Sequence, residues 1–193
     1  MENLFDTDST KKLAPLADRM RPKNLDEFLG QEHIVGKNSF LRRAITFDKL
    51  GSCIFYGPPG TGKTTLASII ANQTNSFFVS LNAVSCGVAD VKKVIADAKT
   101  NIELYGKKTY LLLDECHRWN KAQSDSMLEA IEKGHIIFIG STTENPFVSM
   151  TRAIVSRCRI FEFKPLKKEN IIFAINRALS DTQNGYGNLE KNI

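Results

Sequence analysis

Short apolar blocks alternate with longer amphipathic segments along most of this chain. Five apolar runs predict buried strands, at residues 53–56, 77–81, 110–113, 136–139 and 160–163. Apolar residues at helical spacing predict helices at residues 39–47, 64–73, 88–104, 120–133 and 167–180. Because wholly apolar strands alternate with helices, we expect an α/β fold with a five-stranded parallel sheet flanked by helices.

The pattern also predicts the domain organisation. Residues 1–14 are mostly polar and predict an N-terminal tail, in which Leu4 and Phe5 form a hypothetical short binding motif. Residues 15–165 hold all five predicted strands and form the expected core domain. Pro165 interrupts the chain before the last helix, and one amphipathic helix cannot bury its own apolar face. We therefore expect residues 166–193 to be the first part of a helical second domain that continues beyond this sequence.

The segment between the first strand and the next helix has the pattern of a phosphate-binding loop. Residues 57–64, GPPGTGKT, match G-x-x-x-x-G-K-[ST] and stand between a strand and a helix, as the motif requires. Glycines let backbone N–H groups turn toward phosphates, and the helix N-terminus adds a positive dipole. In this motif Lys63 contacts the β- and γ-phosphates, and Thr64 gives a hydroxyl to Mg²⁺. The chain is therefore predicted to bind a nucleoside triphosphate.

A pair of carboxylates ends the third predicted strand. Asp114 and Glu115 follow the phosphate loop by about 50 residues, where P-loop ATPases place an Mg²⁺-binding aspartate. A neighbouring glutamate can act as the general base that activates water, which favours a hydrolase over a passive nucleotide switch. Residues 114–117 also spell a helicase-like D-E-x-H box. For His117 we favour a solvated or capping role over coupling to DNA or to the γ-phosphate.

Composition narrows the class of protein only slightly. A hydrophobic content of 42% excludes a disordered chain, and no apolar run approaches the length of a membrane span. The four cysteines lie at least 30 residues apart, without the close pairs of zinc sites, and we expect reduced thiols in a cytoplasmic protein. A net charge of +5 permits a polyanionic partner without identifying one.

Together these motifs resemble an AAA+ ATPase. Residues 17–31 are similar to an N-terminal box that clamp loaders share with the Holliday-junction motor RuvB, where the segment wraps the adenine. Residues 114–125, DECHRWNKAQSD, and 140–146, GSTTENP, more specifically resemble the replication-associated recombination protein A family. Its eukaryotic relative is the Werner-helicase-interacting protein. The similarity extends from about residue 15 to 166.

The resemblance implies further roles for individual residues. Thr143 matches sensor 1, which reads the γ-phosphate, with Asn145 as a less favoured choice. Arg157 matches the arginine finger that enters a neighbouring subunit's nucleotide site. The catalytic set is then Lys63, Asp114, Glu115, Thr143 and Arg157, with Mg²⁺ held by Thr64 and Asp114. The expected ATP-binding residues are Arg21, Pro22, Gly57, Pro58, Pro59, Gly60, Thr61, Gly62, Lys63, Thr64 and Thr65.

The function that the resemblance implies is an ATP-hydrolysing motor acting on DNA at stalled or damaged replication forks. The expected cofactors are ATP and Mg²⁺. The expected partners are forked, gapped or partly single-stranded DNA, single-strand-binding protein and other replisome factors, and further copies of the chain. We expect a cytoplasmic, nucleoid-associated protein with no membrane partner. A clamp-loader subunit and a nucleotide-binding assembly module with little turnover remain the alternatives.

Overall fold

Five parallel strands form the centre of the structure, a computed structural model that describes residues 14–187. The strands are β1 (Cys53–Tyr56), β2 (Phe77–Asn82), β3 (Thr109–Asp114), β4 (Ile137–Thr142) and β5 (Arg159–Glu162). Their order in the sheet is β2-β3-β4-β1-β5, and every neighbouring pair is parallel. The predicted five-stranded parallel sheet is confirmed. Leu4 and Phe5 lie outside the described residues.

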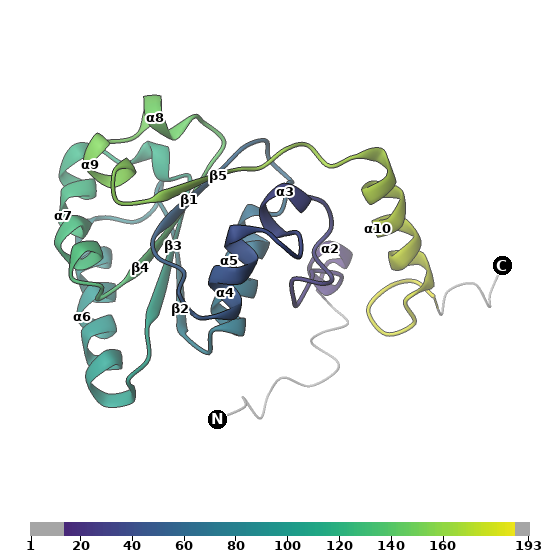
Figure 1. Ribbon diagram of the computed structural model, residues 1–193, viewed down its shortest axis with the longest axis horizontal. Coiled ribbons are helices and arrows are strands. Elements are labelled where there is room, and N and C mark those ends of the chain that lie inside the picture. The colour runs from purple at the N-terminus through teal and green to yellow at the C-terminus, as the bar shows by residue number, and fades with distance from the viewer. Residues whose placement is uncertain (1–13, 188–193) are drawn as a thin grey trace. The chain divides into compact units, whose positions relative to one another are not determined.

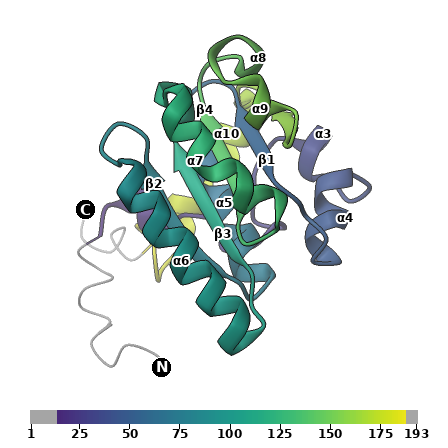
Figure 2. The ribbon, with the colours of Figure 1, turned by 90° about the vertical axis from the view of Figure 1, so that its left-hand side faces the viewer.

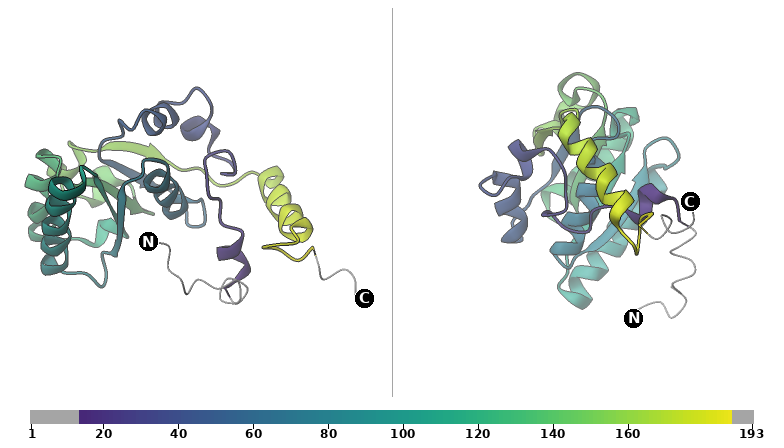
Figure 3. Two further views of the ribbon diagram at one scale, coloured as in Figure 1. Left: turned by 90° about the horizontal axis from the view of Figure 1, so that it is seen from below. Right: turned by 90° about the vertical axis from the view of Figure 1, so that its right-hand side faces the viewer.

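Helices cover both faces of this sheet. Helices α6 (Val88–Tyr105) and α7 (Lys121–Glu132) pack side by side on one face, and α5 (Lys63–Gln73) lies on the other, near α4 (Phe40–Thr46) (Figures 1 and 2). Figure 3 shows the same layers from below. The shorter helices are α3 (Glu32–Val35), η1 (Cys116–Arg118), α8 (Pro146–Ser149) and α9 (Arg152–Val155).

The core is built around the central strands. Residues 109–113 of β3 are fully buried, because β2 and β4 flank the strand and helices cover both faces. Side chains of α6 and α7, including Val91, Ala98 and Met127, pack with Leu111 and Phe138 of the sheet. The strand therefore reads as an unbroken apolar run, as parallel strands buried on both faces do.

Local signals set the helix ends near their predicted positions. At the start of α7, Asn120 and Gln123 form a reciprocal capping box, with N–H to side-chain oxygen distances of 2.9 and 3.0 Å. Gly134 just beyond α7 takes the left-handed conformation expected of a helix C-terminus (φ 69°). The sequence boundaries of α7 were thus wrong by only one residue at each end.

A second compact unit contains the described residues up to Gly30 together with those from Leu166 onward. It holds α2 (Leu16–Arg19) and α10 (Lys168–Ser180). An ion pair of 3.1 Å joins Arg177 of α10 to Glu27. The sheet belongs to the other unit, Gln31–Pro165. Within residues 14–187, no helix combines the length and the apolar character that a membrane span requires.

Candidate nucleotide-binding and hydrolysis site

Three strand ends bring the predicted site residues to one edge of the sheet. Tyr56, the last residue of β1, pairs with Thr142 of β4, and Asp114 of β3 pairs with Ser141 of β4. Because the strands are parallel, the loops that follow β1, β3 and β4 all leave from this carboxyl edge. The phosphate loop, the carboxylate pair and the residues after β4 are therefore neighbours, in the place where open α/β sheets bind ligands.

The phosphate loop depends on glycine at its first position. Gly57 has φ +143°, and a Cβ atom there would lie 2.2 Å from the carbonyl oxygen of Phe163. Its N–H donates to the carbonyl of Thr142 over 3.2 Å, which ties the loop to the end of β4. Gly60 and Gly62 also have positive φ, 73° and 96°. The loop thus takes a backbone course that residues with side chains rarely adopt.

Lys63 occupies the inside of this loop. Its ammonium donates to the carbonyls of Gly57 (2.8 Å) and Pro58 (2.9 Å), and only 8% of the residue is exposed. Burial lowers the pKa of Lys63, while the carboxylates of Asp114 and Glu115 raise it. The loop and the end of β3 share one edge of the sheet, so these opposite charges belong to one site. A cation held by weak carbonyl acceptors is ready to transfer to phosphate oxygens.

The first turn of α5 supplies backbone donors next to Lys63. Gly62 is the N-cap in a left-handed conformation, and no side chain caps this helix. The first N–H groups of a helix without a side-chain cap are free to bind an anion. At 11 residues, α5 is long enough to add its dipole to this attraction. Thr64 and Thr65 lie half-buried in this turn. All the predicted loop residues are thus on one continuous segment, as a phosphate-binding loop requires.

The carboxylate pair is held by an unusual backbone turn. Asp114 ends β3, and its Oδ1 accepts the N–H of Glu115 (3.1 Å). Glu115 itself is left-handed (φ 54°, ψ 37°), a conformation that costs a residue with a side chain about 1–2 kcal/mol. Strain of this kind concentrates at functional sites, where the surrounding structure enforces it.

The residues present fit Mg²⁺ bound together with nucleotide. Among the described residues, no group of three or more His, Cys, Asp and Glu could hold a metal by itself. Mg²⁺ is commonly bound through one or two protein oxygens plus substrate phosphates, so a self-sufficient cage is not expected. Thr64 and Asp114 would supply those oxygens. The bound ion would neutralise charge on the phosphates.

His117 differs from its sequence prediction. Its side chain is only 9% exposed, so the predicted solvated role is wrong. Nδ1 lies 2.9 Å from Oγ1 of Thr142 and 3.5 Å from Oε2 of Glu115, and Nε2 lies 3.5 Å from Oε1 of Glu144. Thr142 and Glu144 were not predicted from the sequence as neighbours of the site. The D-E-x-H box was the one signal that pointed to this position.

Thr143, the residue matched to sensor 1, follows β4 directly and is exposed at the carboxyl edge of the sheet. The strand was predicted to end at residue 139 and extends three residues further, to the buried Thr142. Asn145 caps the short helix α8, because its side chain accepts the N–H of Phe147 (3.0 Å). The assignment of Thr143 to sensor 1 stays a prediction.

Arg157, just after α9, is paired within its own chain. Its guanidinium donates to Oε1 of Glu132 through Nε (2.7 Å) and through Nη2, and to the carbonyl of Ala153 through Nη1 (2.7 Å). The neighbouring Arg159 stacks over the ring of Phe40, 3.7 Å from the ring centre. The positive charge of Arg157 is therefore opposed by Glu132 at the end of α7.

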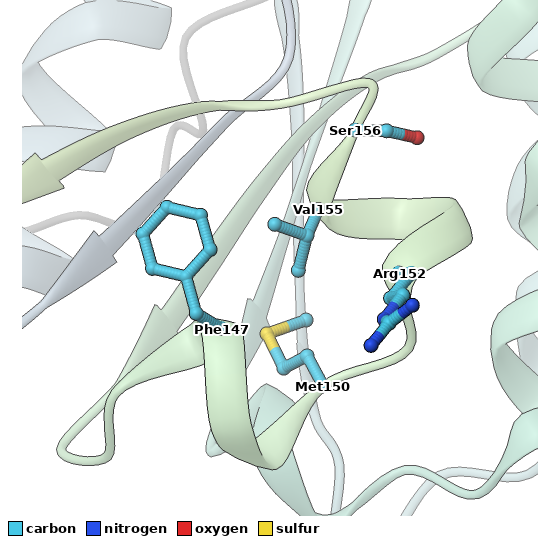
Figure 4. A pocket seen from close by; sticks show the side chains of 5 residues that line it. All are labelled: Phe147, Met150, Arg152, Val155 and Ser156. Atoms are coloured by element: carbon cyan, nitrogen blue, oxygen red, sulfur yellow. The ribbon is translucent and has the colours of Figure 1, made fainter.

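A surface pocket of about 380 Å³ lies beside Arg157 on α8 and α9. Figure 4 shows its lining side chains: Phe147, Met150, Arg152, Val155 and Ser156. None of the predicted nucleotide-binding residues lines this pocket.

Arg21 and Pro22 belong to the other compact unit, where Arg21 forms an ion pair of 3.1 Å with Asp18. Their contact with adenine stays a prediction.

The phosphate loop, the carboxylate pair and the parallel order of the strands define the chain as a P-loop ATPase. Residues 53–166 match the family model "ATPase family associated with various cellular activities (AAA)", and the chain belongs to this family. The predicted fold and class are thereby confirmed.

Known proteins narrow the resemblance further. The chain is 46% identical to the ATPase WRNIP1 of Dictyostelium discoideum, over 89% of this chain and 20% of that protein. It is 43% identical to the replication-associated recombination protein A of Escherichia coli, over 97% of this chain and 42% of that protein. These matches confirm the family that residues 114–125 and 140–146 suggested. The chain thus spans less than half the length of these relatives.

A solved structure supports the fold independently. The chain resembles the RuvB Holliday junction branch migration motor of Thermotoga maritima with a TM-score of 0.67 and 31% identity. The match covers 84% of this chain and 54% of that one.

Proposed function

We propose that this chain binds ATP with Mg²⁺ and hydrolyses it at the carboxyl edge of the sheet. The observation that carries the proposal is that the phosphate loop around Lys63 and the carboxylate pair of Asp114 and Glu115 leave from the same carboxyl edge of the sheet. Lys63 and the loop N–H groups would hold the β- and γ-phosphates. Glu115 would accept a proton from the attacking water as general base.

Two further residues would complete the reaction. Thr143 would contact the γ-phosphate from the end of β4, where the parallel register brings it beside the phosphate loop. Arg157 would leave its own chain's Glu132 and enter the nucleotide site of a neighbouring copy. A cation supplied in trans stabilises the charge that develops on the transferring phosphoryl group. Hydrolysis would thereby require assembly of a homo-oligomer.

The work driven by ATP is proposed from the relatives. Replication-associated recombination protein A and WRNIP1 are named for replication, recombination and ATP hydrolysis, and RuvB for branch migration at Holliday junctions. For this chain we propose action on DNA at stalled or damaged replication forks, together with single-strand-binding protein and replisome factors. The location would be the cytoplasm, at the nucleoid.

We further propose that residues 15–165 form the nucleotide-binding core and residues 166–193 the start of a helical lid.

The test is ATP turnover with and without DNA. Forked or gapped DNA should raise the turnover rate more than blunt duplex of the same length. Lys63→Met should remove turnover on every DNA, and Glu103→Gln, an exposed change on α6, should leave it intact. Equal rates with and without all DNA substrates would contradict the fork function while leaving the ATPase assignment in place.

A further inference from the structure

The imidazole of His117 lies between two carboxylates at the carboxyl edge of the sheet. Nδ1 faces Thr142 Oγ1 (2.9 Å) and Glu115 Oε2 (3.5 Å), while Nε2 faces Glu144 Oε1 (3.5 Å). The side chains of Glu115 and Glu144 are 38% and 54% exposed, whereas that of His117 is 9% exposed. The histidine is therefore the buried member of this group, with the carboxylates on its solvent side.

The local backbone holds the imidazole in this place. The left-handed Glu115 turns the chain into the single 3-10 turn η1, closed by the N–H of Arg118 on the carbonyl of Glu115 (2.9 Å). Cys116, 1% exposed, anchors the turn in the core, with its Sγ 3.5 Å from Sδ of Met150. A side chain on a turn fixed at both ends has few orientations, so the contacts of His117 are set by the fold.

Thr142 links this histidine to the strand that carries the sensor residue. Its hydroxyl oxygen accepts the N–H of Glu144 (3.0 Å) and meets Nδ1 of His117. Thr142 is 1% exposed and directly precedes Thr143, and its carbonyl accepts the N–H of Gly57 in the phosphate loop. One path of hydrogen bonds thus runs from the phosphate loop through the end of β4 to the imidazole beside Glu115.

The geometry points to His117 as a positioning residue for ATP hydrolysis. Its imidazole holds the Glu115 carboxylate in a fixed relation to the end of β4, so that the base faces the water next to the γ-phosphate. The inference rests on the proposed role of Glu115 as general base. A base displaced by about 1 Å can lose on the order of 100-fold in rate, so a partner that fixes it has a measurable effect. At 9% exposure, His117 itself is too covered to serve as a DNA contact.

Substitutions at His117 should separate the contributions of its two nitrogens. His117→Ala should lower kcat for ATP by roughly 10- to 100-fold. His117→Asn, whose amide nitrogen takes the approximate position of Nδ1, should recover part of that loss. His117→Gln, whose amide reaches toward the position of Nε2 and Glu144, should recover less. His135→Asn, at the opposite end of β4, is the matched control and should leave kcat unchanged.

Two further measurements distinguish positioning from damage to the fold. The affinity for ADP and the midpoint of thermal unfolding should stay close to wild type in His117→Asn. In a Glu115→Gln background, adding His117→Ala should cause no further loss of the residual rate, because the base that it positions is already absent. A separate, multiplicative loss in the double variant would overturn the proposal.

The outcomes also separate this inference from the function on which it rests. If wild type hydrolyses ATP, Glu115→Gln does not, and His117→Ala keeps the wild-type kcat, then the role of His117 is wrong and that of Glu115 stands. If Glu115→Gln hydrolyses ATP like wild type, both are wrong. If His117→Ala does not fold, the comparison of His117→Asn with His117→Gln tests the proposal instead. We expect a higher kcat in the Asn variant than in the Gln variant. Equal kcat values in these two variants would contradict the role of His117 as a positioning residue.

Discussion

The guanidinium of Arg157 is held by the carboxylate of Glu132 of α7, within the same chain. A finger that acts on a neighbouring subunit must first leave this partner. The two side chains are 34% and 51% exposed, and exposed ion pairs of this kind contribute about 0.2–1 kcal/mol. Glu132 would therefore be a weak competitor for Arg157 if, as proposed, the arginine enters the nucleotide site of a neighbouring subunit.

The first prediction follows from this competition. Glu132→Gln should raise ATP turnover of the assembled protein by up to about fivefold, because the ion pair contributes no more than about 1 kcal/mol. Glu129→Gln is the matched control, since Glu129 pairs with Lys133 on the same helix (2.6 Å). Arg157→Ala should abolish stimulation on assembly, and mixing it with Lys63→Met subunits should restore turnover. A Glu132→Gln protein as slow as Arg157→Ala would contradict the competition.

A second prediction concerns the start of the phosphate loop. Gly57→Ala would place Cβ 2.2 Å from the carbonyl oxygen of Phe163 at a φ of +143°. The clash and the strained backbone should together cost about 3 kcal/mol or more and abolish nucleotide binding. The control is Gly51→Ala, because a Cβ there meets nothing within 4 Å. Thermal unfolding measures the loss of stability, and titration with a fluorescent ADP analogue measures the loss of nucleotide binding. Normal affinity for the analogue in Gly57→Ala would contradict the backbone conformation of Gly57 in the phosphate loop.

A third prediction concerns the proposed Mg²⁺ ligand on α5. Thr64→Val removes the hydroxyl at nearly constant volume, whereas Thr64→Ser retains it. The valine variant should need at least tenfold more Mg²⁺ for half-maximal turnover, since a hydrogen bond or ligand to a charged group contributes about 1.5–3 kcal/mol. The serine variant should titrate like wild type, and chelation of Mg²⁺ should stop both. Identical Mg²⁺ curves for valine and serine would exclude this hydroxyl as a ligand.

A fourth prediction concerns the cysteines. Burial raises the pKa of Cys158 to about 12 and raises those of Cys53 and Cys116 above their usual range. At pH 8 the reactive thiolate fraction falls about tenfold for each unit of increase in pKa. Iodoacetamide should therefore modify Cys86 first in the folded protein, because Cys53 and Cys116 are buried and the half-buried Cys158 has a pKa of about 12. All four thiols should react at similar rates in guanidinium. Peptide mapping by mass spectrometry reports the order, and early modification of Cys116 would contradict its burial.

The strands, the long helices and the phosphate loop could be predicted because their signals are local. The run ending at Asp114 is apolar since β3 is buried on both faces, and the glycines around Lys63 reflect backbone conformation alone. The boundaries of these elements differ from the prediction by at most one residue, except at the end of β4, which differs by three. The strand β4 extends to Thr142, where hydrogen bonds of the sheet decide its end.

The contacts that refine the site could not be predicted in this way. Arg157 and Glu132 lie 25 residues apart in sequence, and so do His117 and Thr142. His117 meets Thr142 because the sheet order places the ends of β3 and β4 together. Arg157 meets Glu132 because α9 packs against α7. The left-handed turn at Glu115 is likewise a tertiary effect, since glutamate has no local preference for it.

The central claim is that ATP is hydrolysed at the edge shared by Lys63, Asp114 and Glu115. The most direct test is a single-turnover measurement with enzyme in excess over ATP and Mg²⁺ present, comparing wild type with Glu115→Gln. We predict that the variant binds ATP with an affinity within about threefold of wild type but cleaves it at least about 100-fold more slowly, as expected on loss of a general base. Cleavage by Glu115→Gln at the wild-type rate would contradict the account.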